Sequence, residues 1–474
     1  MENNGKRKNK KINTLNPINN TNKKIFIIFD LIIFFLYMPL SIENVILRKL
    51  VSIEQIIITV KGIGEKAILN YEYNYPPDEV IINGNSVEFS YTEGGAENYK
   101  FQLDLEKNII FLNYNSCPNT FKNMFANIDD LIKVDLSKID TTNVNDMTRM
   151  FYDCSLLEEV YMKGLKTSSV TTMESMFESC IALTSIDLSN FDTSSVLNMK
   201  LMFYSCQVLN SLDVSNFDTS KVKDMNYMFG GLKAIKILDV SNFIFNDVQM
   251  YSMFKQCLLL ETIKFPKTNR VITNNIGTMF QDCKSLKSLD LSTFDTSNDS
   301  YMAFLFDNCY KLFSVDLSSF NTSKVEDFSN MFAYCADLKS LDLSNFRTNS
   351  ANYMKGMFTG CNLKYLNIRF FEISENVEID FMLSDNFDNT KICFDSDKAG
   401  KITSLNNNLN NICEDDCFNS NYKLIIETST CIENCLNDDY YKYEYNNICY
   451  SKCPSNTVEK NNVCEDTLIC LIII

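Results

Sequence analysis

The chain has 474 residues, 45% of them hydrophobic, so it is long enough for several folded units with sizeable apolar cores. Its net charge is −16 although basic residues concentrate at the very start, which argues against nucleic acid as a partner. The chain contains no histidine, which removes the usual general base near neutral pH and every histidine-ligated metal site. We therefore expect a protein that is not an enzyme and that needs no cofactor.

Residues 1–24 are basic and rich in Asn, which predicts a disordered leader. An apolar run follows, and residues 25–41 are interpreted as a signal-anchor or as the h-region of a signal peptide. The run is shorter than the roughly 20 residues of a full membrane span, and Asp30 interrupts it. Either alternative makes the membrane a partner of residues 25–41 and places the bulk of the chain outside the cell or in the secretory lumen.

Residues 42–116 are predicted to form a β-rich cap. Alternating, β-branched and aromatic residues predict strands in the segments EQIIITV, AILNYEYNY, EVIINGNSVEFSY and YKFQLDL. The tripeptide Asn83-Gly84-Asn85 predicts a turn. Such a cap would cover the apolar end of the segment that follows.

The dipeptide Met-Phe recurs from residue 124 onward with almost constant spacing. If Leu305-Phe306 is included, it occupies ten positions with a period of about 26 residues. Eight of the nine intervals are equal, and the interval from Met228 to Met253 is shorter by a single residue. A fixed period of this length is typical of a solenoid, in which each unit buries its apolar face only against its neighbours. The sequence therefore predicts about ten turns over residues 117–396.

Each repeat divides into two parts. The first reads LxxLxLxxF, and in one copy Leu341 and Leu343 share one face of a short strand. The second places apolar residues three or four apart, as at Val222 and Met225, which predicts a helix that Ser220 would cap. The predicted fold class is an α/β solenoid, with a parallel ladder of strands and a helical segment in every turn.

This pattern is similar to that of leucine-rich repeats. The copy LDVSNFDTSKVKDMNYMF, which starts at Leu212, resembles the BspA-type leucine-rich-repeat surface proteins, and the resemblance covers residues 117–396. It implies a role in binding or adhesion at a cell surface and supplies no catalytic residues. The basic N-terminal region and the cysteine-rich tail depart from the bacterial members of that family.

The cysteines form two populations. Eight recur three residues after the repeated Phe and are predicted to be buried, unpaired thiols, with disulfides between adjacent turns as the alternative. After an Asn-rich linker, residues 397–412, a cysteine-rich module at residues 413–466 has too few apolar residues to fold without cross-links. We predict disulfides there rather than Cys₄ zinc sites. The candidate disulfide cysteines are Cys413, Cys417, Cys431, Cys435, Cys449, Cys453, Cys464 and Cys470.

Residues 467–474 are an apolar tail or the start of a truncated membrane segment. Three N-x-[ST] sequons occur, and Asn321 is the candidate glycosylation site among them.

The candidate ligand face is a row of carboxylates at the outward position of the predicted strands, called the aspartate row below. Its members are Asp135, Asp187, Asp213, Asp239, Asp290, Asp316 and Asp342. A cationic ligand or Ca²⁺ would relieve the repulsion between such closely spaced carboxylates. We favour instead a structural ladder in which each Asp accepts hydrogen bonds from the adjacent turn.

The sequence thus predicts an extracellular, membrane-associated surface protein that binds a protein or glycan partner through its strand face. Two alternatives stay open. The first is a structural coat or spacer protein with no specific ligand. The second, more remote, is a hydrolase that uses carboxylates alone, although the row is too regular for the two differing carboxylates that acid–base chemistry needs.

Overall fold

The computed structural model describes residues 54–89, 99–383, 387 and 390–395, together with six short strands between residues 423 and 466. The predicted leader, the apolar run at 25–41, the Asn-rich linker and the apolar tail lie outside the described residues. Across the part of the chain that is described, no helix has the length and hydropathy needed to cross a membrane.

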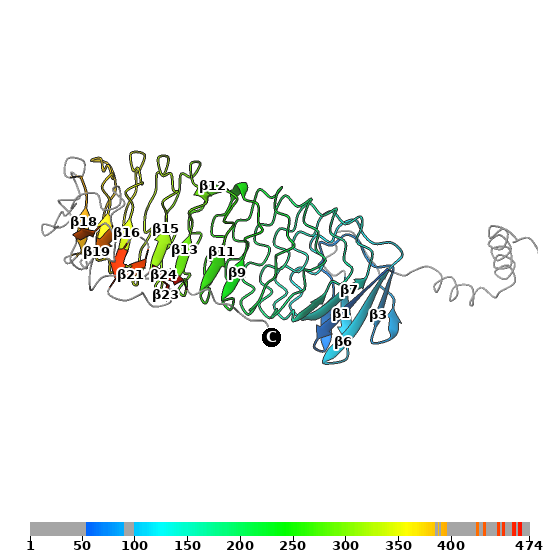
Figure 1. Ribbon diagram of the computed structural model, residues 1–474. Helices are drawn as coiled ribbons and strands as arrows, with labels where there is room; N and C mark the ends of the chain where they lie inside the picture. Colours follow the sequence, from blue (N-terminus) through cyan, green and yellow to red (C-terminus); the bar gives the residue numbers. More distant parts are fainter. Residues whose placement is uncertain are drawn as a thin grey trace, which may run out of the picture. The chain divides into compact units, whose positions relative to one another are not determined.

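The first strands belong to a six-stranded sheet with the order β4-β3-β6-β1-β7-β8 (Figure 1). These strands are β1 (Glu54–Lys61), β3 (Glu79–Ile82), β4 (Asn85–Val87), β6 (Lys107–Tyr114), β7 (Leu131–Lys138) and β8 (Glu159–Tyr161). A separate antiparallel pair consists of β2 (Gly64–Ala67) and β5 (Lys100–Leu103). Because β7 pairs with β1 on one side and with β8 on the other, one strand joins the N-terminal sheet to the repeats.

Two details of this region differ in how well the sequence predicted them. The turn at Asn83 and Gly84 is confirmed: both have positive φ, 51° and 88°, and they connect β3 to β4. The strand expected over AILNYEYNY is wrong, because only Ala67 lies in a strand and the following residues form turns and loop. This loop lines a pocket described below.

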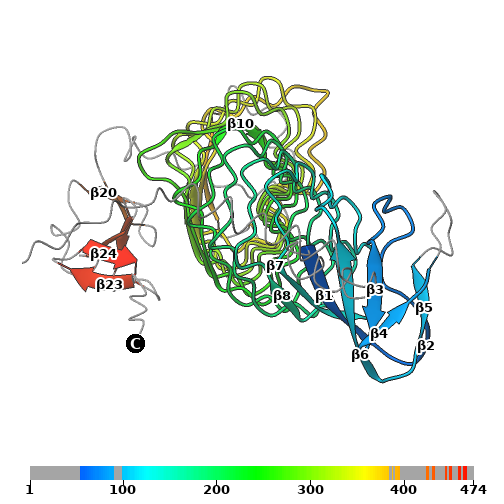
Figure 2. The same cartoon turned by 90° about the vertical axis from the view of Figure 1, so that its right-hand side faces the viewer.

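From residue 117 the chain winds as a solenoid, and each circuit of about 26 residues is called a coil here (Figure 2). Short parallel strands stack along one side of it. After β7 and β8 they are β9 (Ile237–Asp239), β11 (Thr262–Lys264), β13 (Ser288–Asp290), β15 (Ser314–Asp316), β16 (Ser340–Asp342), β17 (Tyr365–Asn367) and β18 (Lys391–Cys393). A second parallel sheet consists of β10 (Asn246–Gln249), β12 (Val271–Asn275) and β14 (Phe294–Asp295).

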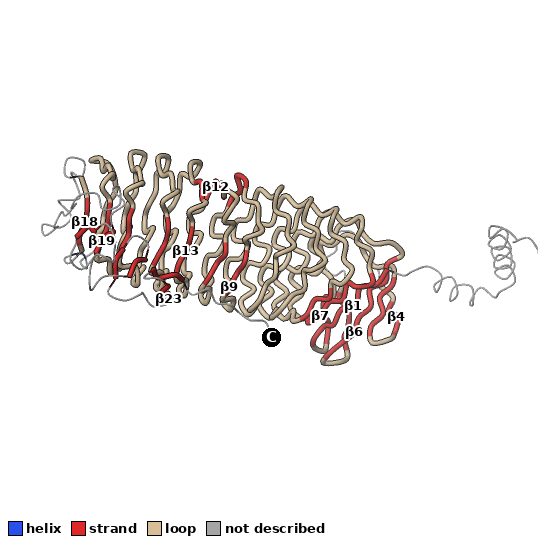
Figure 3. Tube along the Cα trace, viewed as in Figure 1, coloured by secondary structure: helices blue, strands red, loops and turns tan. Residues whose placement is uncertain are grey.

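The predicted helical segments are wrong, because the described residues of the repeats contain strands, turns and loops but no α-helix (Figure 3). Along this segment the backbone N–H groups donate alternately to two kinds of carbonyl acceptor. Those of Met150 and Cys154 bond to the carbonyl three residues back, whereas those of Arg149, Phe151 and Asp153 donate to the next coil at 2.8–2.9 Å. A helix would send every one of them to the carbonyl four residues back. The α/β class therefore becomes a β-solenoid built from strands and tight turns.

Left-handed backbone conformations enforce this alternation. Two positions, four residues apart, have positive φ in all ten coils, from Asn123 and Asn127 to Gly356 and Gly360. A right-handed helix excludes such residues. The apolar spacing of three and four residues, which suggested a helix, arises because each tight turn brings one side chain back to the interior.

The interior confirms the predicted apolar column of the solenoid. All ten Met-Phe positions, with Leu305-Phe306 among them, are fully buried. The rings of the repeated Phe form one continuous stack, with centroids 5.3–6.1 Å apart and interplanar angles of 20° or less. Each coil thus buries its aromatic ring between those of its two neighbours, as a repeat that cannot fold alone requires.

A ladder of buried threonines, which the sequence analysis did not single out, also connects the coils. Thr193 Oγ1 donates to the carbonyl of Asp218 at 2.9 Å and accepts from its N–H at 2.8 Å, so one hydroxyl serves both backbone groups. The same pair of hydrogen bonds, one donated and one accepted, is made by the hydroxyl groups of Thr141, Thr167, Thr219, Thr296, Thr322 and Thr348. These threonines therefore connect one coil to the next, at the part of the repeat where we had expected Ser220 to cap a helix.

The eight repeat cysteines are free and buried, in agreement with the prediction of unpaired thiols. Each Sγ donates to the carbonyl of a Phe in the preceding coil, as Cys206 does to Phe177 at 3.1 Å. Burial raises the pKa of Cys206 and of Cys257 to about 12.

We expect these eight thiols to resist alkylation in the folded protein at pH 8, because only an exposed thiolate reacts at a useful rate. Mass spectrometry after iodoacetamide treatment, with and without urea, measures this directly. Modification of Cys206 in the folded protein would contradict the prediction.

The cysteine-rich module contains three antiparallel hairpins joined by parallel pairing into one six-stranded sheet, with the order β20-β19-β22-β21-β24-β23. Its strands are β19 (Lys423–Ile425), β20 (Thr430–Ile432), β21 (Tyr443–Tyr445), β22 (Ile448–Tyr450), β23 (Thr457–Lys460) and β24 (Val463–Asp466). Cys431, Cys449 and Cys464 each lie in the second strand of a hairpin. The disulfides among the eight tail cysteines stay a prediction. Cys393, at the end of β18 and missing from our candidates, is disulfide-bonded.

Candidate functional site

The aspartate row lies on the outer side of the strand ladder, where the register places equivalent residues side by side. Asp290 is paired directly with Asp316 between β13 and β15. Adjacent strands lie about 4.8 Å apart, so these two carboxylates are neighbouring like charges, whereas Asp135 is paired with Tyr161 and Ile57. Five members are exposed, and Asp135 and Asp342 are half-buried. Burial raises the pKa of Asp342.

Every member of the row makes the same local hydrogen bond. Oδ1 of Asp213 accepts from the N–H of Ser215 at 2.9 Å, and the other six accept in the same way from the residue two positions on, at 2.9–3.1 Å. We had expected the adjacent coil to supply the donor, but the donor belongs to the same coil. The carboxylate thus fixes the turn that ends its own strand, an Asx-turn, and its second oxygen is left for other partners.

In two coils these turns favour the charged form of the carboxylate. Hydrogen bonds from Ser189 and Ser215 lower the pKa of Asp187 and of Asp213 below the ordinary value. Asp187 and Asp213 are therefore ionised at neutral pH.

One coil supplies a cation. Lys264 takes the place of the Asp in β11, and its Nζ lies 2.9 Å from Oδ2 of Asp239 in β9, the preceding strand of the ladder. The pKa of Asp239 is lowered, because bonds from Ser241 and Lys264 outweigh the partial burial that opposes them. At the start of the ladder, Lys133 pairs with Glu159 at 3.0 Å. A lysine ammonium group therefore fits beside the row without distorting the strands.

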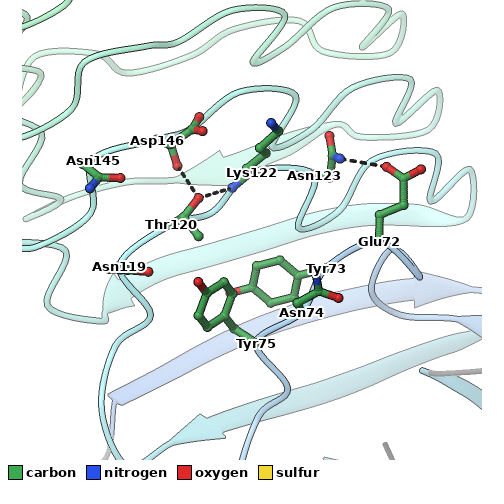
Figure 4. A pocket seen from close by; sticks show the side chains of 10 residues that line it. All are labelled: Glu72, Tyr73, Asn74, Tyr75, Asn119, Thr120, Lys122, Asn123, Asn145 and Asp146. Atoms are coloured by element: carbon green, nitrogen blue, oxygen red, sulfur yellow. Dashed lines mark hydrogen bonds between the residues drawn. The ribbon is translucent and has the colours of Figure 1, made fainter. Parts of the chain in front are cut away.

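A pocket of about 580 Å³ lies between the loop after β2 and the first two coils (Figure 4). The sequence analysis did not identify it, because it had assigned a strand to this loop. Glu72 accepts from Asn123 Nδ2 at 2.9 Å, and Asp146 Oδ1 accepts from the N–H of Thr148 at 2.8 Å. The Glu72 bond connects the loop to the first coil, whereas the Asp146 bond fixes a turn within the second coil. This arrangement gives no support to a carboxylate-only hydrolase here.

The structure also bears on the two other kinds of site considered from the sequence, a metal site and a glycosylation site. Within the described ranges, no three carboxylate or cysteine side chains converge as ligands for a metal ion. Asn321 is exposed, and its Oδ1 accepts from the backbone and hydroxyl of Ser323 at 3.1 and 2.8 Å. Its glycosylation stays a prediction.

Comparison with solved structures adds little to this geometry. One chain of the Drosophila Toll–Spätzle complex is 13% identical, with a TM-score of 0.22, over 57% of this chain and 46% of that one. A leucine-rich-repeat protein of Leptospira interrogans is 12% identical, with a TM-score of 0.23, over 60% of this chain and 90% of that one. The protein thus spans less than half of the Toll-complex chain. Such scores carry no argument, and the fold assignment rests on the repeat geometry itself.

No curated protein matches the sequence. A protein-family profile, however, matches residues 119–243 and residues 274–393, which together are more than half of the chain. The gap between the two segments contains β10, β11 and most of β12, and it begins within the shortened interval that ends at Met253. On this match, the chain belongs to the family described as "Mycoplasma protein of unknown function, DUF285".

Proposed function

We propose that this protein is a non-catalytic binding protein of the cell surface, and that its aspartate row binds a cationic segment of a partner protein. The observation that carries the proposal is the pairing of Lys264 with Asp239, because it demonstrates within the ladder the contact that a partner lysine would make elsewhere in the row. Neutral or acidic glycans lack the charge that this face complements, so a protein partner is favoured.

The small neighbours of the row support the same proposal. In five coils the residue two positions before the Asp on the same outer face is a serine, at Ser185, Ser211, Ser288, Ser314 and Ser340. Short side chains leave the carboxylates sterically accessible to a long Lys or Arg side chain. The repeated motif, which resembles that of BspA-type surface proteins, agrees with a role in adhesion.

The cellular setting is part of the proposal. A basic leader before an apolar run at residues 25–41 supports a membrane attachment there, with the bulk of the chain outside the cell. Seven cysteines in the short module at residues 413–466, followed by Cys470, agree with an oxidising compartment.

The first test measures binding of the chain from residue 54 onward to an octalysine peptide by isothermal titration calorimetry at low salt. The Asp187→Asn, Asp213→Asn double variant is expected to bind about fivefold more weakly, because it removes two adjacent charges from the row. Asn keeps the acceptor oxygen of the Asx-turn, so the fold is retained.

A matched control is available in the same two coils. Asp192 and Asp218 are also exposed, and each accepts from the N–H of a serine two residues on, but they lie outside the row. The Asp192→Asn, Asp218→Asn variant has the same net charge and is expected to bind almost as well as the parent. Equal weakening by both pairs would show that only net charge matters and would refute the row as the binding surface.

A further inference from the structure

One column of inward-facing side chains runs through the solenoid with a single polar interruption. In eight coils the position holds a small apolar residue, namely Val144, Val170, Val196, Val222, Val248, Val325, Ala351 and Val377, all buried. Between Val248 and Val325, two successive coils place Thr273 and Asp299 there instead, and neither side chain has any exposed surface. A carboxyl group thus occupies a valine site in the core.

The contacts of Asp299 satisfy only part of this buried group. The Thr273 hydroxyl in the preceding coil donates to Oδ2 of Asp299. Oδ1 is buried and has no hydrogen-bond partner among the described residues. The charged group that affects Asp299 electrostatically is the carboxylate of Asp295 in the same coil. That carboxylate pairs with Arg270 Nη2 at 3.0 Å. No cation of the described residues therefore pairs with an ionised Asp299 itself.

Burial dominates the titration of this group. It raises the pKa of Asp299 to about 6, against the lowering effect of the Thr273 hydroxyl and the Ile276 backbone, and the Asp295 carboxylate raises it further. A buried acid of this kind is neutral in mildly acidic surroundings and charged at neutral pH.

We propose that Thr273 and Asp299 form a proton-operated joint between two adjacent coils, which pack firmly when Asp299 is protonated and loosen when it is ionised. Coils contact only their nearest neighbours, so the change is confined to this part of the solenoid. The family match breaks off at residue 243 and resumes at residue 274, so Thr273 is the last residue of the gap and Asp299 lies in the matched segment that follows.

The direction and size of the effect follow from linkage. The folded protein binds the proton of Asp299 more tightly than the unfolded chain does, so this group favours the folded joint below pH 6 and the advantage is lost as the pH rises through 6. Between pH 5 and pH 7.5, the equilibrium constant for opening the joint is expected to rise about tenfold.

Hydrogen exchange in the full chain, followed by mass spectrometry at both pH values and corrected for intrinsic rates, tests the proposal. Peptides covering residues 271–306 should be protected about tenfold better at pH 5, whereas peptides covering residues 144–206 should show no comparable change. Asp299→Val restores the column and should remove the pH dependence and raise protection at pH 7.5. Asp299→Asn should also remove the pH dependence, but without the gain in packing.

Asp187→Asn is the matched control, since it removes an exposed carboxyl and should leave the tenfold difference at residues 271–306 intact. A parent protein without that difference would overturn the joint. So would an Asp299→Val variant that retains it, because another group would then be the titrating one.

Discussion

Replacing Phe203 with alanine is expected to lower the free energy of unfolding by about 3–5 kcal/mol. Its ring is fully buried and lies 5.8 Å from the ring of Phe177 and 6.1 Å from that of Phe229. The substitution therefore leaves a cavity and also breaks the aromatic stack on both sides. Urea unfolding followed by circular dichroism measures the loss.

Phe203→Leu is the control, because it keeps most of the apolar volume and removes only the stacking. Its cost should be less than half of that for alanine. A Phe203→Ala variant that unfolds at the urea concentration of the parent would show that the stack does not hold the solenoid together.

Replacing Thr193 with valine is expected to cost about 2–4 kcal/mol although the two side chains have almost the same shape. The hydroxyl is the partner of both the N–H and the carbonyl of Asp218, and Thr193 is 1% exposed. Valine leaves these two backbone groups of the next coil without their partner in a part-buried site. The loss should appear in urea unfolding and as faster exchange of the Asp218 amide.

Thr193→Ser supplies the matched control. It removes a methyl group but keeps the hydroxyl, so the amide of Asp218 should stay protected and the loss of stability should be about 1 kcal/mol. If Thr193→Val were no less stable than Thr193→Ser, the double hydrogen bond would contribute nothing to the contact between coils.

The period, the number of coils and the buried column could be predicted from the sequence. A repeat that buries its apolar face against similar neighbours must place apolar residues at the same positions in every coil, and this regular spacing is visible in the sequence. Met202 and Phe203 lie in the core as the spacing predicts. The path of the backbone could not be predicted from the sequence. Steps of three and four residues fit a helix and a succession of tight turns equally well, and ordinary residues such as Arg149 with positive φ give no local signal.

The candidate site divides in the same way. Period alone located the aspartate row, since identical positions in successive coils must lie side by side. The donor to each carboxylate depends on the turn geometry, which the periodic pattern does not encode. The Thr273–Asp299 pair was visible in the sequence as two departures from the valine column, but only an alignment of the coils reveals that they are neighbours.

The alternating backbone hydrogen bonds have a consequence for how a gene that encodes this solenoid can change in length. Every coil donates hydrogen bonds to the next from the same positions. An in-frame duplication or deletion of one whole period therefore restores these backbone hydrogen bonds, wherever within the repeat its boundaries fall. Unequal recombination between repeats can thus lengthen or shorten the solenoid without passing through an unfolded product. The segment around residues 244–299, with its shortened interval and its polar pair, is the part that such exchange would not reproduce.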